Sequence, residues 1–202
     1  MEKILNVETV LITRRTVVRR FREMEGAALF ELVRANAGLL QDLHPAVLPP
    51  FENVESAEIF VRRGLAAWLL QESYHFAIWD KDSATMIGYV AFEPVYWEQS
   101  KARLQGFIGT SRQASGVMSE VLEILLPLGF LQLGLTKVSL EVGSENVAAH
   151  RLARRMGFVR EGDLREEYRK ASGEPFDVVL FGLTSNLYPL HPGKNASSRY
   201  SK

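Results

Sequence analysis

Hydrophobic and polar residues follow two different periods along the chain, and each period predicts one kind of element. Apolar side chains recur every three or four residues, as in amphipathic helices, over 23–43, 56–73, 116–134 and 145–158. Runs rich in Val, Ile, Thr and aromatic residues, which are typical of strands, cover 8–21, 75–80, 86–94, 102–108, 137–142, 158–169 and 175–183. A basic turn interrupts the first run, and the second and third runs form a predicted hairpin. The order β-α-α-β-β-β-α-β-α-β-β predicts one mixed α/β sheet flanked by helices.

Particular residues mark where the helices begin, bend or end. Asn146 or Ser144 is a suitable N-cap for the fourth helix, and Gly157 is the residue expected just beyond its last turn. The prolines of 44–51 end the first helix. Pro127 lies inside the third helix, where it removes a backbone hydrogen bond, so we expect a kink there.

Composition narrows the class of protein. With 202 residues, 47% of them hydrophobic, the chain can build one well-buried core, so we assign 1–187 to a single domain and the polar segment 188–202 to a C-terminal tail. The 24 basic and 24 acidic side chains cancel, so no net field attracts nucleic acid or an anionic membrane. No apolar run has the length of a membrane span, and no N-terminal apolar stretch predicts a secretion signal. We therefore expect a soluble, cytoplasmic protein without nucleic-acid or membrane partners.

One motif in the second half of the chain is long enough to suggest a family. The pattern N-x6-A-x-R-x-G-F-x-x-E-G-x-L-R is formed by Asn146, Ala153, Arg155, Gly157, Phe158, Glu161, Gly162, Leu164 and Arg165, followed by Asp177, Phe181 and Leu183. On these residues the chain, from about residue 8 to 184, resembles the GCN5-related N-acetyltransferase (GNAT) superfamily. Within it, the chain is most similar to the Rim-type acetyltransferases of ribosomal-protein N-termini. The resemblance implies a mostly antiparallel sheet with a splayed centre, acetyl-coenzyme A as co-substrate and an amine as acceptor.

The loop and helix start over 108–118 suit a pyrophosphate. A helix N-terminus offers unpaired N–H groups and a partial positive charge, and small residues let the backbone approach phosphates closely. The resemblance identifies this segment as the acyl-coenzyme A loop, whose pattern Gln/Arg-x-x-Gly-x-Gly/Ala is matched at Gln113 and Gly116 but not at Met118. The residues expected to contact the cofactor are Ile108, Gly109, Arg112, Gln113, Ala114, Ser115, Gly116, Val117, Met118 and Asn146. By itself, the segment is also consistent with an ordinary loop that caps a helix.

Two of these residues have roles that the sequence leaves open. Met118 is larger than the family pattern allows, and either crowds the pyrophosphate or turns into the core. Asn146 either caps its helix alone or also contacts the pantetheine arm. Arg112 adds a cation beside the expected phosphates.

Acetyl transfer to an amine needs a polarised thioester carbonyl, a neutral amine and a proton for the leaving thiolate. The resemblance implies that a backbone N–H near 107–109 polarises the carbonyl, and that a Ser or Tyr on the helix after Asn146 supplies the proton. The matching positions hold Ala149 and Ala153, and neither side chain can donate a proton. His150 is adjacent, but one residue along a helix turns a side chain by about 100°, so we expect it to face elsewhere.

Several carboxylates are candidates for taking the proton of the amine. Glu93 is the first choice because it ends a strand in an apolar, aromatic segment, and apolar surroundings disfavour the charge of a carboxylate. Glu166 and Glu167 lie near where the Rim-type branch places a substrate-facing carboxylate, and Tyr168 beside them can donate a proton. Each of these side chains is equally consistent with an ordinary solvated group. The other charged residues of the motif are expected to brace the fold: Glu161, Arg165 and Asp177.

Other candidate chemistry has less support. The chain has no cysteine, which excludes disulfides, thiolate metal sites and a cysteine nucleophile. His44 and His75 are far apart in the sequence, so we expect no metal site from them. The basic clusters, Arg154–Arg155 among them, alternate with acidic residues and are expected to be solvated.

Two functions of different classes remain. The first is transfer of an acetyl group from acetyl-coenzyme A to a primary amine, either a protein N-terminus or a small amino compound. The second is non-catalytic binding of acyl-coenzyme A, or of a partner, on the same fold, and Met118 and the alanines at 149 and 153 favour it. We favour the enzyme, because a thiolate can also leave with a proton from water. The acceptor pocket is expected from the loops 38–56 and 94–101, and the sequence is compatible with a homodimer.

Overall fold

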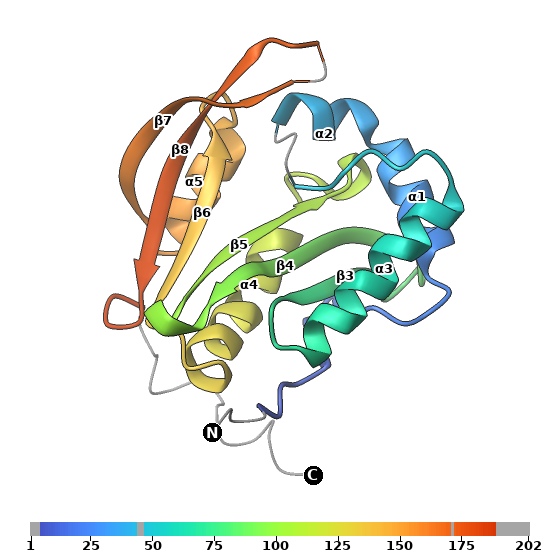
Figure 1. Ribbon diagram of the computed structural model, residues 1–202, viewed down its shortest axis with the longest axis horizontal. Helices are drawn as coiled ribbons and strands as arrows, with labels where there is room; N and C mark the ends of the chain where they lie inside the picture. The colour runs from blue at the N-terminus through green and yellow to red at the C-terminus, as the bar shows by residue number, and fades with distance from the viewer. Residues whose placement is uncertain (1–4, 44–46, 171, 189–202) are drawn as a thin grey trace.

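The computed structural model describes residues 5–43, 47–170 and 172–188, and of 41–43 the backbone alone. One sheet of eight strands, in the order β1-β2-β3-β4-β5-β6-β8-β7, forms its centre (Figure 1). The strands are β1 (Val10–Ile12), β2 (Thr16–Arg20), β3 (Tyr74–Asp80), β4 (Met86–Tyr96), β5 (Lys101–Ile108), β6 (Lys137–Gly143), β7 (Val159–Arg169) and β8 (Pro175–Thr184). The helices are α1 (Gly26–Ala35), α2 (Ala37–Leu43), α3 (Val54–Leu69), α4 (Val117–Pro127) and α5 (Val147–Arg155). The mixed, mostly antiparallel sheet confirms the predicted fold class.

The sheet opens at its centre, between β5 and β6. These strands are parallel, and they pair only at Lys101–Lys137, Ala102–Val138 and Arg103–Ser139. Beyond these pairs, β5 continues alongside β4 as far as Ile108, whereas β6 continues alongside β8. Figure 1 shows β5 and β6 diverging from this point. The splayed centre that the family resemblance implied is therefore present.

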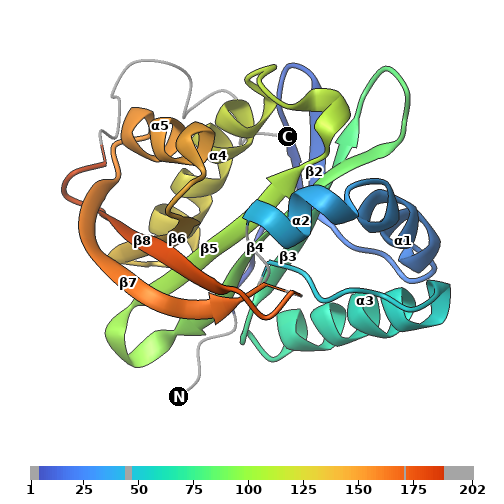
Figure 2. The same ribbon diagram turned by 90° about the horizontal axis from the view of Figure 1, so that it is seen from above.

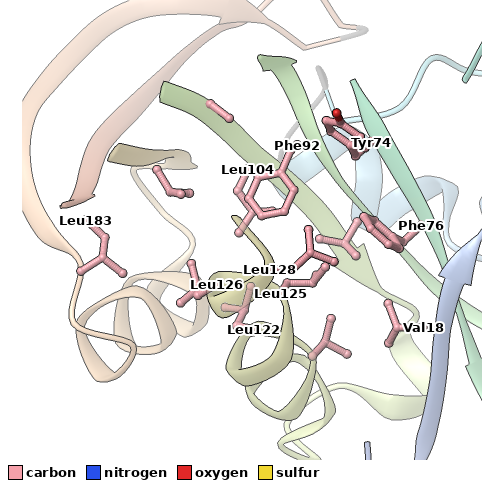
Figure 3. Packing of buried hydrophobic residues seen from close by; sticks show 14 of the residues in the cluster. Val18, Tyr74, Phe76, Phe92, Leu104, Leu122, Leu125, Leu126, Leu128 and Leu183 are labelled. Atoms are coloured by element: carbon pink, nitrogen blue, oxygen red, sulfur yellow. The ribbon is translucent and has the colours of Figure 1, made fainter. Parts of the chain in front are cut away.

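Helices cover both faces of the sheet (Figures 1 and 2). On one face, α1 packs against α3 and β4, and buried side chains such as Leu29, Val61 and Tyr89 form one apolar cluster. On the other face, Leu122 and Leu125 of α4 belong to the main core together with Phe92 of β4 (Figure 3). The strands are thus held from both sides by close-packed side chains, and this packing fixes the opening between β5 and β6.

The first predicted helix is in fact two helices. α1 ends at Ala35 and α2 begins at Ala37, and Asn36 between them departs from helical geometry (φ −123°, ψ 19°). The buried side chain of Asn36 donates from Nδ2 to the carbonyl of Leu32 (2.8 Å). The prediction of one helix over 23–43 is therefore wrong. Helical spacing continues across Asn36, but a local hydrogen bond of its side chain competes with the helix.

Two further helices differ from their predicted bounds. α3 is capped by Asn53, whose side chain accepts from the N–H of Ser56 (2.8 Å), and it ends at Leu69, earlier than predicted. α4 ends at Pro127, and the next turn, Leu128–Gln132, is a π-helix. Pro127 therefore alters the helix at the predicted place, by a change of helix type.

The ends of α5 agree with the sequence. Asn146 is its N-cap, with Oδ1 accepting from the N–H of Ala149 (3.0 Å), and Gly157 follows the helix with a φ of +88°. His44 and all of the predicted tail except Tyr188 lie outside the described residues.

Candidate active site

A cavity of about 580 Å³ lies where β5 and β6 part. Its walls come from β5 and β6, from the first residues of α4 and α5 and, on the face covered by α1 and α3, from Leu39, Leu40 and Val47. Eight of the ten predicted cofactor residues line it: Ile108, Arg112, Gln113, Ala114, Gly116, Val117, Met118 and Asn146. The other two, Gly109 and Ser115, belong to the same loop but are not in the wall. Segments far apart in the sequence thus meet around one cavity, and its wall includes residues from both faces of the sheet.

The N-terminus of α4 forms part of this wall. Gly116 is the N-cap with a φ of +81°, a conformation that glycine adopts without strain. Its carbonyl accepts from the N–H groups of Ser119 and Glu120 (3.1 and 3.3 Å). The amides of Val117 and Met118 precede these bonds, so they are among the N–H groups that a helix leaves without an internal partner. Together with the helix dipole, they suit an anionic group.

Two arginines border the same wall. Arg112 forms an ion pair with Asp80 (2.7 Å), and its side chain remains 42% exposed. The pKa of Asp80 lies below its usual value because the N–H of Ser83 donates to its carboxylate, with a smaller contribution from Arg112. Arg155 reaches from the end of α5 to the hydroxyl of Ser119 on α4. Arg155 is exposed, as expected, but it also contributes to the cavity.

Arg15 restrains the loop before α4, and the sequence gave no indication of this role. Its Nη1 donates to the carbonyl of Ser115 (2.6 Å), and its Nε donates to Glu120 (3.1 Å). The first contact joins residues 100 positions apart. In the sequence, Arg15 belongs to a basic turn within a strand region, and this pattern does not identify the partners of Arg15.

Met118 and Asn146 both line the cavity. Met118 is partly buried against the main core and also lines the cavity, so it turns inward. Asn146 lines the cavity while it caps α5. Its role as a cap is confirmed, and a contact with pantetheine stays a prediction.

Every second backbone N–H group of β5 points toward the opening between β5 and β6. The N–H of Gly109 donates to the carbonyl of Ile87 (2.8 Å), so it is already used within the sheet. In an antiparallel pair, successive residues direct their N–H groups to opposite sides. The amides of Ile108 and Gly106 therefore point away from β4, toward β6. Within the predicted segment 107–109, Ile108 is the residue suited to polarise a carbonyl in the cavity.

Glu93 lies on β4 among polar partners, in contrast to the apolar setting expected from the sequence. Its Oε2 accepts from Nε2 of Gln105 (2.8 Å), and its Oε1 lies 3.7 Å from Nε2 of the buried His75. The Glu93 side chain is 38% exposed and is not in the cavity wall. Gln105, which is in the wall, stands between Glu93 and the cavity.

A carboxylate that sequence reasoning missed, Glu141 of β6, lies in the cavity wall. Both of its oxygens accept from Nη1 of Arg103 (3.0 Å each), and the hydroxyl of Tyr168 donates to one of them. Burial raises the pKa of Tyr168 to about 12, and the hydrogen bond to Glu141 adds to this effect. Glu141 occupies an ordinary strand pattern, so nothing in the local sequence distinguished it.

The other residues considered for the chemistry differ in whether they face the cavity. Glu167 is exposed and outside the cavity wall. Ala149 and Ala153 line the cavity, so the two positions at which the resemblance implied a hydroxyl do face it. His150 turns away, with Nε2 2.9 Å from the carbonyl of Gly143 and its ring against Phe181, as expected.

Two expectations about bracing residues are confirmed. Glu161 forms an ion pair with Lys137 (2.7 Å), and Asp177 accepts from the N–H of Glu166 (2.7 Å).

In residues 5–43, 47–170 and 172–188, no group of three His, Asp or Glu side chains is arranged to hold a metal ion. The same part of the chain has no helix with both the length and the hydropathy that a bilayer crossing requires.

Residues 15–159 match the family model described as the acetyltransferase (GNAT) domain, which covers most of the chain. The chain belongs to this family. It is 28% identical over 141 residues to p20, an uncharacterized N-acetyltransferase of Bacillus licheniformis, an alignment that covers 70% of this chain and 79% of p20. This GNAT protein is accordingly an acetyltransferase that transfers an acetyl group to an amine.

Solved structures share the fold of this GNAT acetyltransferase. One is the Salmonella typhimurium acetyltransferase that modifies the N-terminal serine of ribosomal protein L7/L12 (TM-score 0.75, 20% identity, covering 85% of this chain and 96% of that one). Another is Mycobacterium smegmatis RimJ in complex with a coenzyme A disulfide (TM-score 0.81, 19% identity, covering 91% and 90%). At identities of 19% and 20%, these likenesses show the shared fold.

Proposed function

We propose that this acetyltransferase takes its acetyl group from acetyl-coenzyme A and transfers it to the free amino group of a protein N-terminus. The observation that carries the proposal is the cavity where β5 and β6 part, because it joins an anion-binding helix start on one face to an apolar wall on the other. Donor and acceptor can enter such a cavity from opposite sides and meet at the edge of β5. A small amino compound is the alternative acceptor.

The donor side has the features that coenzyme A requires. The amides of Val117 and Met118 and the cation of Arg112 suit the pyrophosphate. A Cβ on Gly109 would lie only 3.1 Å from the side chain of Asn36, so glycine allows this loop to pack closely against Asn36. Acetyl-coenzyme A supplies an activated acyl group as a thioester. The N–H of Ile108 is the backbone donor that we assign to its carbonyl oxygen.

Two carboxylates compete for the role of proton acceptor. Glu141 is in the cavity wall and can touch an amine there, and its hydrogen-bond partners are Arg103 and Tyr168. Glu93 has fewer compensating partners but reaches the cavity only across Gln105. Because a base must lie within hydrogen-bond reach of the proton it removes, we assign the role to Glu141 and keep Glu93 as its rival.

Tyr168 is the proposed proton donor of the site. Its raised pKa, about 12, keeps the hydroxyl protonated at neutral pH. The hydrogen bond that it donates to Glu141 fixes it beside the carboxylate. Glu166 and Glu167, which are close in sequence but exposed, are the remaining carboxylates proposed from the sequence.

The acceptor class is tested by incubating the protein with acetyl-coenzyme A and peptides that begin with serine or alanine. Matched peptides, blocked at the N-terminus but containing lysine, are the control, and a panel of small amines is the third arm. Mass spectrometry should detect one added acetyl group on the free N-termini alone. Acetylation of the blocked peptides, or of small amines in preference to free N-termini, would overturn the assignment.

A further inference from the structure

A row of polar side chains crosses the face of the sheet that α1 and α3 cover. In the register of the strands, His75 of β3 lies beside Ala91 of β4, and Ala91 lies beside Gln105 of β5. Tyr89 and Glu93 are two residues to either side of Ala91 on β4, so their side chains share its face. Because the side chain of Ala91 is small, these four polar groups can contact one another across it.

The contacts form a continuous chain. The hydroxyl of Tyr89 lies 2.9 Å from Nδ1 of His75, and Nε2 of His75 lies 2.8 Å from the hydroxyl of Ser73. The same Nε2 is 3.7 Å from Oε1 of Glu93, and the other oxygen of Glu93 accepts from Gln105. His75 and Tyr89 are almost completely buried. The rest of this face is an apolar cluster. If this part of the sheet had only a structural role, apolar side chains would be expected here as well.

This chain fixes the orientation of the Gln105 carboxamide. An ionised carboxylate only accepts hydrogen bonds, so Glu93 must bind the NH₂ end of Gln105. The carbonyl end, Oε1, is then the end that Glu93 does not hold, in a side chain that lines the cavity. An oxygen held in this way is a hydrogen-bond acceptor placed in advance for a ligand that carries N–H groups.

The position of Gln105 identifies that ligand as the acceptor. Donor-side groups line the cavity at α4 and α5, whereas Gln105 faces the side of Leu39, Leu40 and Val47. Arg103, two residues earlier on β5, shares this face and binds Glu141. An amino group bound at Gln105 therefore lies between the cofactor loop and the proposed proton acceptor.

From these relationships we infer that Gln105 binds the amino group of the acceptor through Oε1, and that Glu93 and His75 act as positioning residues that hold Gln105 in this orientation. The inference rests on the proposed function and adds a residue that selects for an N–H donor. Tyr89 and Ser73 hold the His75 ring from either side. The neutral side chain of Gln105 can bind an ammonium or an amine, so it retains the acceptor before and after the proton leaves.

The test is a comparison of Gln105→Met with Gln132→Met. Methionine has nearly the volume of glutamine but no carbonyl oxygen, and Gln132 lies outside the cavity wall and outside both predicted acceptor loops. With a peptide that begins with serine or alanine, Gln105→Met should raise the KM for the peptide at least about tenfold, with the KM for acetyl-coenzyme A unchanged. Gln132→Met loses the hydrogen bond to the N–H of Glu8 but should leave both constants at their wild-type values. An unchanged peptide KM in Gln105→Met overturns the inference.

A second pair of variants tests the positioning chain and guards against misfolding. Gln105→Asn keeps the amide but shortens its reach, so the peptide KM should rise here too. Glu93→Gln allows the Gln105 amide to turn over, because the new amide can also donate; the peptide KM should rise while kcat stays within about twofold. A fall in kcat with an unchanged peptide KM would make Glu93 a base and overturn its positioning role. A wild-type protein that binds coenzyme A but acetylates no amine would overturn the proposed function and, with it, this inference.

Discussion

The side chain of Asn36, in the break between α1 and α2, accepts a hydrogen bond at Oδ1 from the backbone N–H of Thr110 (2.8 Å), 74 positions further along the chain. Its Nδ2 donates to the carbonyl of Leu32 at the same time. One buried amide therefore ties the break between α1 and α2 to the start of the proposed cofactor loop.

Replacing Asn36 by alanine should destabilise the protein and loosen this loop. The substitution leaves the carbonyl of Leu32 and the N–H of Thr110 without their partner, so the free energy of unfolding should fall by about 1–3 kcal/mol. Urea denaturation measures this change. The exposed Asn186 provides the control, since Asn186→Ala should stay within about 0.5 kcal/mol of wild type. Equal stability of the two variants would show that the Asn36 contacts contribute nothing net.

The glycine that begins α4 should be required for the cofactor. Gly116→Val places a branched side chain at a φ of +81° beside the unpaired amides, and should weaken coenzyme A binding at least about tenfold, or about 1.4 kcal/mol. Gly134→Val is the matched control, because Gly134 also has a positive φ (+69°) but lies away from the cavity. Both variants should lose stability through backbone strain. Calorimetry should find weaker coenzyme A binding in the Gly116 variant alone, and unchanged affinity there would remove the loop from the cofactor site.

The two rival carboxylates should differ in which kinetic constant they control. General-base assistance is typically worth 10²–10⁴-fold, so Glu141→Gln should lower kcat by about that factor while the affinity for coenzyme A stays nearly intact. The glutamine keeps the size of the side chain and can still bond to Arg103 and Tyr168. Full activity of Glu141→Gln would transfer the role to Glu93 or Glu167. Full activity in variants of all three would leave proximity and an ordered water as the source of the rate.

Tyr168 should ionise at a higher pH than a free tyrosine, so the free energy of unfolding should fall at alkaline pH. Its pKa is about 12 in the folded chain and about 10 in an unfolded one. The folded state therefore holds this proton more tightly, so the stabilisation is fully present below pH 10 and is lost as the pH rises to about 12. The difference between the ultraviolet titrations of wild type and Tyr168→Phe should have its midpoint near 12. A midpoint near 10 would mean that burial and Glu141 do not hold the hydroxyl neutral.

The features that the sequence predicted well are those set by local chemistry. Asn146 and Gly157 bound α5 because an N-cap and a positive φ leave direct marks in a sequence. The small residues before α4 likewise marked a loop that lines the cavity, and its contact with a cofactor stays a prediction. Asn36 is the counterexample: helical spacing continues through it, and the break depends on a partner, Thr110, that is remote in sequence.

The acceptor side of the site was predicted less well, because it depends on register between strands. The contact of Gln105 with Glu93 follows from the pairing of β4 with β5, and that of Glu141 with Tyr168 from strands that are not neighbours in the sheet. A pattern of apolar and polar positions shows which face a residue occupies but not which residue lies beside it. Glu93 was therefore found without its partners, and Glu141 was not found.

The central claim is that donor and acceptor meet in the one cavity between β5 and β6. The most direct measurement is the affinity of a bisubstrate conjugate, in which coenzyme A is joined covalently to the amino group of a peptide that begins with serine or alanine. If both halves bind in this cavity, calorimetry should find the conjugate bound at least about a hundredfold more tightly than coenzyme A alone, and Gln105→Met should lower the affinity for the conjugate but not that for coenzyme A. A conjugate that binds no more tightly than coenzyme A would contradict the account.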